Sequence, residues 1–171
     1  IGDKLTLANG ANTVTASNVE TIVGDSGADV VTLNTVIAGG NIDLGDGADQ
    51  LVLKNGTNNL TATNIETITG GTGADTITLG AAQTSGTFNL GAGTDTLNLS
   101  SSGNNTLTLD ASVERLNGGT AADAITLTQA VSGAVFDLSG GADSLTLANG
   151  TNILTASSVE SITGSAGDED I

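Results

Sequence analysis

Aliphatic and polar residues alternate in short stretches, each of which follows a Gly-rich segment that ends in Asp. An aliphatic residue stands two and four positions after each of these aspartates, and the positions between are mostly Thr, Ser, Asn, Gln or Ala. The aliphatic residues are Leu5, Leu7, Val31, Leu33, Leu51, Leu53, Ile77, Leu79, Leu97, Leu99, Ile125, Leu127, Leu145 and Leu147. A period of two is typical of a strand with one buried face. The pattern therefore predicts a strand after every Gly-Asp segment, with these aliphatic side chains inside.

The sequence also has a longer repeat, and each copy of it contains two of these Gly-Asp segments. The phrase Asn-Val-Glu-Thr-Ile at residues 18–22 returns as Asn-Ile-Glu-Thr-Ile at 64–68 and, more loosely, near 113–116 and 159–162. Its glutamates, Glu20, Glu66, Glu114 and Glu160, recur at successive spacings of 46, 48 and 46. The aspartates that close the Gly-rich segments are Asp3, Asp29, Asp49, Asp75, Asp95, Asp123 and Asp143, and their successive spacings are 26, 20, 26, 20, 28 and 20. One unit of this size cannot bury its apolar face alone, whereas stacked units can.

The repeats predict an all-β fold, a parallel β-solenoid of the β-roll or β-helix kind. We expect about seven stacked coils, in which short coils of about 20 alternate with long coils of about 26 to 28, and every Gly-Asp turn lies at one edge. Residues 1–171 contain no linker or shift in composition, so they are expected to form a single repeat-array domain, a fragment of a longer array. Antiparallel hairpins are the alternative, and they are disfavoured because they do not require one motif at one phase in every unit.

Composition removes several classes of function. The chain has 19 acidic and 3 basic residues, a net charge of −16, and no His or Cys. Thiolate or imidazole metal sites, disulfide scaffolds and a nucleic-acid footprint are therefore excluded. No apolar run is long enough to predict a membrane span. No Ser has a base beside it, so the chain is not expected to be an enzyme.

Stacked coils would bring the aspartates into one column, about 5 Å apart. Like charges at that distance repel by roughly 3 kcal/mol per pair at an effective dielectric near 20. A cation between the carboxylates would remove this cost, and oxygen ligands without nitrogen or sulfur favour Ca²⁺. The candidate ligands are Asp3, Asp29, Asp49, Asp75, Asp95, Asp123 and Asp143. The alternative is that each Asp only closes its turn by bonding its own backbone.

The Gly-Asp segments resemble the calcium-binding repeat of RTX (haemolysin-type) proteins. Residues 70–78, Gly-Gly-Thr-Gly-Ala-Asp-Thr-Ile-Thr, match that family's GGxGxDxUx motif in full, and residues 24–32 lack only its second Gly. The resemblance implies that glycine carbonyls and the Asp hold Ca²⁺ between turns of a β-roll. It carries over to Gly27, Gly47, Gly73, Gly93 and Gly141. The chain departs from the motif at Ala121 and Glu169, and its wider spacing implies calcium at one edge, where RTX repeats use both.

Two further columns have open interpretations. The repeated glutamates are expected at a corner of the coil, where they either accept backbone N–H groups or form a second column of ligands. Thr residues recur at outward strand positions, as at Thr76 and Thr78. Thr at these positions is explained by its ordinary preference for strands. Regular Thr arrays are also typical of ice-binding β-solenoids, which is the alternative interpretation.

These observations predict a structural, calcium-stabilised segment of a large secreted or cell-surface bacterial protein, such as an adhesin, surface-layer or matrix-fibre component. The Asn-Val-Glu phrase resembles repeat arrays of bacterial surface proteins. Its partners are expected at the cell surface or in the matrix, and its open coil edges are expected to associate end to end. The alternatives are an ice- or surface-binding solenoid and a subunit of an end-to-end filament.

Overall fold

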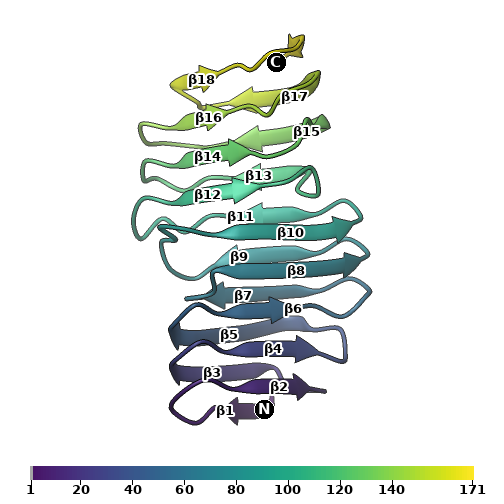
Figure 1. Cartoon of the computed structure of the whole chain (residues 1–171), viewed down its shortest axis with the longest axis vertical. Coiled ribbons are helices and arrows are strands. Elements are labelled where there is room, and N and C mark those ends of the chain that lie inside the picture. The colour runs from purple at the N-terminus through teal and green to yellow at the C-terminus, as the bar shows by residue number, and fades with distance from the viewer. Residues whose placement is uncertain (1) are drawn as a thin grey trace.

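The structure, a computed structural model, describes residues 2–171, and this part of the chain contains strands and no helix. The strands stack along one axis into a rod, with the N-terminal strands at one end and the C-terminal strands at the other (Figure 1). All of the strand pairs are parallel, and they form two sheets. The predicted parallel β-solenoid is therefore confirmed.

Strands with odd numbers form one sheet, called sheet A here, and strands with even numbers form the other, sheet B. Sheet A contains β1 (Lys4–Thr6), β3 (Thr21–Ser26), β5 (Ala38–Asp46), β7 (Asn59–Thr63), β9 (Thr76–Leu79), β11 (Thr96–Asn98), β13 (Arg115–Asn117), β15 (Ser132–Asp137), β17 (Asn152–Ser157) and β19 (Glu169–Asp170). Sheet B contains β2 (Thr13–Ala16), β4 (Val30–Leu33), β6 (Gln50–Val52), β8 (Thr67–Thr72), β10 (Thr87–Ala92), β12 (Thr106–Leu109), β14 (Ala124–Leu127), β16 (Ser144–Thr146) and β18 (Ser161–Thr163). The chain thus crosses from one sheet to the other after every strand.

The described residues form about eight coils of roughly 20 residues, so the expected alternation of short and long coils is replaced by coils of similar length. The strand registers show the coil length directly, because Thr76 pairs with Thr96, 20 residues later, and Asn59 pairs with Thr76, 17 residues later. The shorter spacing between aspartates corresponds to one coil. The longer spacing corresponds to about one and a half coils, because it contains an additional strand.

The expectation that all Gly-Asp turns lie at one edge is wrong. Asp29 and Asp49 precede strands of sheet B, whereas Asp75 and Asp95 precede strands of sheet A. The reason is arithmetic: one sequence repeat spans five strands, from β1 up to the start of β6, and five is odd. Each successive repeat therefore presents the same motif at the opposite edge of the rod.

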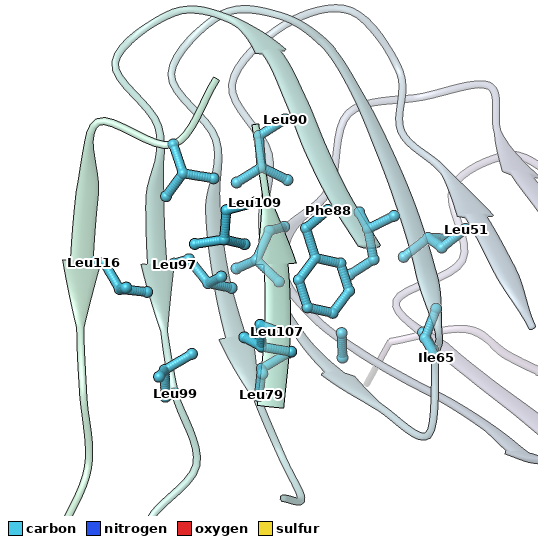
Figure 2. Close-up of a cluster of buried hydrophobic side chains, with 14 of the residues drawn as sticks. Leu51, Ile65, Leu79, Phe88, Leu90, Leu97, Leu99, Leu107, Leu109 and Leu116 are labelled. Atoms are coloured by element: carbon cyan, nitrogen blue, oxygen red, sulfur yellow. The ribbon is translucent and has the colours of Figure 1, made fainter. Parts of the chain in front are cut away.

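The core is a narrow aliphatic layer between the two sheets. Of the fourteen positions predicted to be inside, all except Leu5 are buried, and Leu5 is partly buried in β1 at the end of sheet A. Figure 2 shows Phe88 of β10 among leucines from neighbouring coils, with Leu109 and Leu107 on one side of it in this view and Leu51 on the other. The assignment of inward and outward faces is therefore confirmed.

Glycine in β3, β8 and the segment after β13 lets neighbouring coils approach closely. A Cβ on Gly24, Gly70 or Gly118 would overlap the backbone of a leucine one coil away: Leu44, Leu90 and Leu138, respectively. Close packing at these points holds the coils in register, and this fixes the turns at the two edges relative to one another.

Candidate functional site

The residues at the start of successive coils form three ladders of hydrogen bonds, each made of one Asn, two Asp and one Glu. We call these the Asn–Asp–Asp–Glu ladders. They are Asn12–Asp29–Asp49–Glu66, Asn58–Asp75–Asp95–Glu114 and Asn105–Asp123–Asp143–Glu160. The first and third ladders precede strands of sheet B, and the second precedes strands of sheet A. The two edges of the rod therefore carry the same hydrogen-bonded arrangement.

Each ladder is directional, because backbone N–H groups of one coil donate to a side chain of the next. In the second ladder, the Asn58 backbone N–H and Nδ2 donate to Asp75 Oδ1 at 2.8 and 2.9 Å. The Asp75 N–H donates to Asp95 Oδ1 at 2.7 Å, and the Asp95 N–H donates to Glu114 Oε2 at 2.8 Å. The other two ladders repeat these contacts at 2.7 to 3.1 Å. Four successive coils are joined in this way.

The Asn at the start of a ladder also closes its own turn. Asn58 Nδ2 donates to the carbonyls of Lys54 and Gly56 at 2.8 and 2.9 Å, and its Oδ1 accepts the Ile37 N–H at 3.2 Å. The equivalent Asn12, Asn105 and Asn152 make the same kind of turn contacts. These asparagines were not assigned a role from the sequence, although their recurrence at nearly equal intervals was a signal of one.

Only one oxygen of each ladder aspartate has a partner. The six carboxyl groups are at most 1% exposed. Their Oδ1 atoms accept the ladder hydrogen bonds, whereas the Oδ2 atoms are buried and have no hydrogen-bond partner; the six are Asp29, Asp49, Asp75, Asp95, Asp123 and Asp143. A buried carboxylate oxygen without a partner is costly, because it has lost its hydration and gained nothing in return.

Glycines at the turns bring carbonyl oxygens close to these carboxylates. A Cβ on Gly47 would lie 2.5 Å from the Gly27 carbonyl oxygen and 2.8 Å from Asp49 Oδ1. Gly93 and Gly141 have the same surroundings, next to Asp95 and Asp143. Three of the predicted turn glycines thus leave room for a carbonyl of the preceding coil beside the second Asp of a ladder. Gly27 and Gly73 serve a different need, since their φ angles of +114° and +115° favour glycine.

The second Asp of each ladder is harder to ionise than a free Asp. Burial raises the pKa of Asp95 from its ordinary value of 3.8 to about 6, opposed by the N–H bond from Asp75 and reinforced by the charges of Asp75 and Glu114. Burial raises the pKa of Asp49 and of Asp143 as well, with the same opposing and reinforcing partners in their own ladders. Each pair of ladder aspartates is therefore a place where negative charge is insufficiently compensated.

Asp3 and Glu169 lie outside the three Asn–Asp–Asp–Glu ladders. Asp3 is exposed, and its N–H donates to Glu20 Oε2 at 2.7 Å. Glu169, at the Asp position of the last coil, bonds Ser165 instead of Asn152. The repeated glutamates all accept a backbone N–H at the corner of the coil, which is one of the two interpretations of that column.

The donor chemistry of the paired aspartates fits a hard cation. Two carboxylates from adjacent coils and at least one turn carbonyl supply oxygen only, and oxygen ligands are those that Ca²⁺ prefers. Within residues 2–171, no group of three or more acidic side chains is placed to hold a metal. A cation at an Asp pair would therefore depend on backbone carbonyls for the rest of its ligands.

Comparisons with known proteins add no relative: no family model, curated protein or solved structure matches the chain. In the part that the structure describes, no helix could span a membrane.

Proposed function

We propose that the chain is a structural rod, without enzymatic activity, whose paired aspartates bind Ca²⁺ and so stabilise the stack of coils. The observation that carries this proposal is the set of six buried Asp Oδ2 atoms without a partner. In a protein of net charge −16, burying six carboxyl groups is costly unless something compensates their charge. A cation that bridges adjacent coils would turn this cost into a link along the axis.

The likeness to RTX repeats supports the same proposal. That family carries Gly-Asp turns on both edges of its roll, and here the ladders occupy both edges because the repeat contains an odd number of strands. The spacing difference that set this chain apart from the family therefore has a simple geometric origin. The chain differs in that Gly-Asp turns occur in pairs at each edge, with other coils between the pairs. At the edge before sheet B, for example, Asp49 and Asp123 are separated by the coils that begin at Glu66, Gln83 and Asn105.

An extracellular or cell-surface location, in a bacterial adhesin, surface layer or matrix fibre, belongs to this proposal. Extracellular modules bind calcium with dissociation constants of about 10⁻⁴ to 10⁻³ M, and sites completed by backbone carbonyls suit that range. A rod that needs calcium would then fold where calcium is plentiful. Partners in the matrix, and another copy of the chain at the edges of β1, β2, β18 and β19, are part of the same proposal. Ile1, at one of the coil edges that the sequence predicts to be open, lies outside the described residues.

The test is thermal unfolding in chelator, in millimolar calcium and in millimolar magnesium. We expect calcium to raise the melting temperature well beyond any effect of magnesium, because ligand that binds only the folded state stabilises it. Asp75→Ala should lose part of the calcium effect. Asp25→Asn, which removes a charge from an exposed side chain, is the matched control and should keep it. Equal melting temperatures with chelator and with calcium would reject calcium binding, and the rod would then be a stack of coils that needs no metal.

A second candidate function is binding to ice through the outer face of sheet B. None of the nine strands of this sheet contains Asp, Glu, Lys or Arg, although the chain has 19 acids and 3 bases. Six threonines are also in register across neighbouring strands: Thr67, Thr87, Thr108, Thr126, Thr146 and Thr163. A neutral, regular row of hydroxyl and methyl groups can hold water at a fixed repeat.

Both phenylalanines are fully buried, so this face has no aromatic platform for stacking a sugar. Thermal hysteresis of freezing tests the candidate. Thr126→Tyr, in the middle of the row, should abolish hysteresis, and Thr78→Tyr on the outer face of sheet A should leave it unchanged. Absence of hysteresis in the unaltered chain would reject ice as the ligand without affecting the calcium proposal.

A further inference from the structure

Three turns of the rod have the same construction and each presents an Asn at its tip. They are residues 8–12, 54–58 and 148–152, which read Ala-Asn-Gly-Ala-Asn, Lys-Asn-Gly-Thr-Asn and Ala-Asn-Gly-Thr-Asn. In each turn the last Asn donates from Nδ2 to the first and third carbonyls of the turn. The Gly in the middle has a φ of +97° to +121°, a conformation that L-residues rarely adopt. These contacts hold the turn closed and push its tip outward.

The tip asparagines Asn55 and Asn149 are exposed, and one end of each carboxamide is held. Asn55 Oδ1 accepts the Thr72 N–H at 3.2 Å, and Asn149 Oδ1 accepts the Ala166 N–H at 3.4 Å. Both donors belong to the next coil, so the oxygen faces the rod. The amide nitrogen is at the other end of the group, and no hydrogen bond to the described residues engages it. Each turn thus displays an Asn Nδ2 to solvent in a fixed orientation.

The residue two positions after each of these asparagines is an exposed Thr: Thr57 and Thr151. Asn-x-Thr is the acceptor pattern for asparagine-linked glycosylation, in which the hydroxyl residue is part of what the transferase recognises. We propose that Asn55 and Asn149 are glycosylation acceptors, displayed by the two Asn-Gly-Thr turns. The substrate is a sugar activated on phosphate. A bond forms between Asn Nδ2 and the anomeric carbon, the bond from that carbon to phosphate breaks, and a base of the transferase takes the amide proton.

Two of the other Asn-x-Thr or Asn-x-Ser sequences in the chain have their Asn within a strand. Asn59 lies in β7 and Asn98 in β11, where the backbone pairs with a strand on each side. Asn104 is exposed and lies outside the strands, but the two residues that follow it are held: Asn105 donates from its N–H and side chain to Asp123, and the Thr106 N–H donates to the Gln83 carbonyl. A transferase would have to separate paired strands to bind the segments at Asn59 and Asn98, and it would have to break the Asn105 and Thr106 contacts to bind the segment at Asn104. The two Asn-Gly-Thr turns need no such opening, so modification should be confined to them.

The first turn supplies a control within the molecule. Asn9 has the same surroundings, and its Oδ1 accepts the Ser26 hydroxyl at 2.7 Å, but Ala11 stands where the hydroxyl residue would be. This turn should remain unmodified. Ala11→Thr should convert it into a third acceptor, because it changes the acceptor pattern and leaves the closed turn intact.

The experiment incubates the folded chain with an asparagine glycosyltransferase and measures intact mass and glycopeptides. One arm uses a soluble enzyme with a nucleotide-activated hexose, and the other uses a membrane oligosaccharyltransferase with a lipid-linked oligosaccharide, which separates the two sources of activated sugar. We expect additions at Asn55 and Asn149, one fewer with Thr57→Ala, no change with Thr57→Ser and one more with Ala11→Thr.

Circular dichroism of each variant checks that the rod is retained. Two results would overturn the proposal: a folded chain that neither enzyme modifies while both modify a peptide control, or sugar added equally at Asn59 and Asn98. Either result is independent of calcium, so the proposed function would stand or fall separately.

Discussion

Asn58→Ala should destabilise the rod strongly, although it removes only a neutral side chain. The substitution deletes hydrogen bonds from Nδ2 to the Lys54 and Gly56 carbonyls and to Asp75 Oδ1, and it leaves the Ile37 N–H without its acceptor. Two neutral bonds, one bond to a carboxylate and one orphaned N–H together amount to about 4–6 kcal/mol of unfolding free energy. That is a large part of the roughly 5–15 kcal/mol typical of a folded domain.

The adjacent Asn59 provides the control. It is exposed, and Asn59→Ala should change the unfolding free energy by no more than about 0.5 kcal/mol. Urea unfolding measures both variants. Because stacked repeats can unfold in segments, amide hydrogen exchange should place the loss in the turn of residues 54–58 and in the adjoining strands β5, β7 and β9. If Asn58→Ala and Asn59→Ala differ by less than about 1 kcal/mol, the ladder does not stabilise the coils as argued.

Three other perturbations follow from the packing and the buried charges. Leu53→Asp or Leu79→Asp places a charge in the buried layer between the sheets and should unfold the local coils. Thr78→Asp, on the outer face, should be tolerated. Far-ultraviolet circular dichroism on heating compares the melting temperatures of these variants. Gly47→Ala should cost about 1–3 kcal/mol in urea unfolding because its Cβ would meet the Gly27 carbonyl, while Gly140→Ala, with open space, should be neutral; equal losses would refute the close approach. In chelator, the melting temperature should fall as pH rises from 4 to 7, because a raised Asp pKa favours the folded state at acid pH and loses that advantage as the carboxyl ionises. Asp95→Asn should flatten this dependence, and an unchanged slope would show that Asp95 does not titrate in the folded rod.

The face of each strand could be predicted from sequence because period-two alternation depends only on local geometry. Leu53 and Leu79 are buried where the pattern placed them. The edge of each turn could not be predicted, because it depends on how many strands the chain forms between two aspartates. The segment from Asp49 to Asp75 includes β7, which sends Asp75 to the opposite edge. The segment expected to form one long coil of about 26 residues therefore spans about one and a half coils.

The aspartates of the candidate site were found by their repetition, and their partners were not. Asn58 taken alone does not indicate a ladder contact, since Asn is common in turns. Its importance comes from the register that aligns it with Asp75 in the next coil. Gln83 is a similar case: it is buried and donates to the Ile65 carbonyl at 3.0 Å, a contact that depends on the stacking of coils. Predicting which residues meet between coils requires the length of the coil, and only the structure gives that length.

Calcium binding at the Asp pairs is tested most directly by titrating the metal-free chain with calcium in a calorimeter. We expect one ion for each pair, Asp29 with Asp49, Asp75 with Asp95, and Asp123 with Asp143, and the loss of one ion in Asp95→Asn. Asp25→Asn, at an exposed position, should bind calcium as the unaltered chain does. Binding that is absent, or that is unchanged when Asp95 is replaced, would contradict the assignment of these buried carboxylates to calcium.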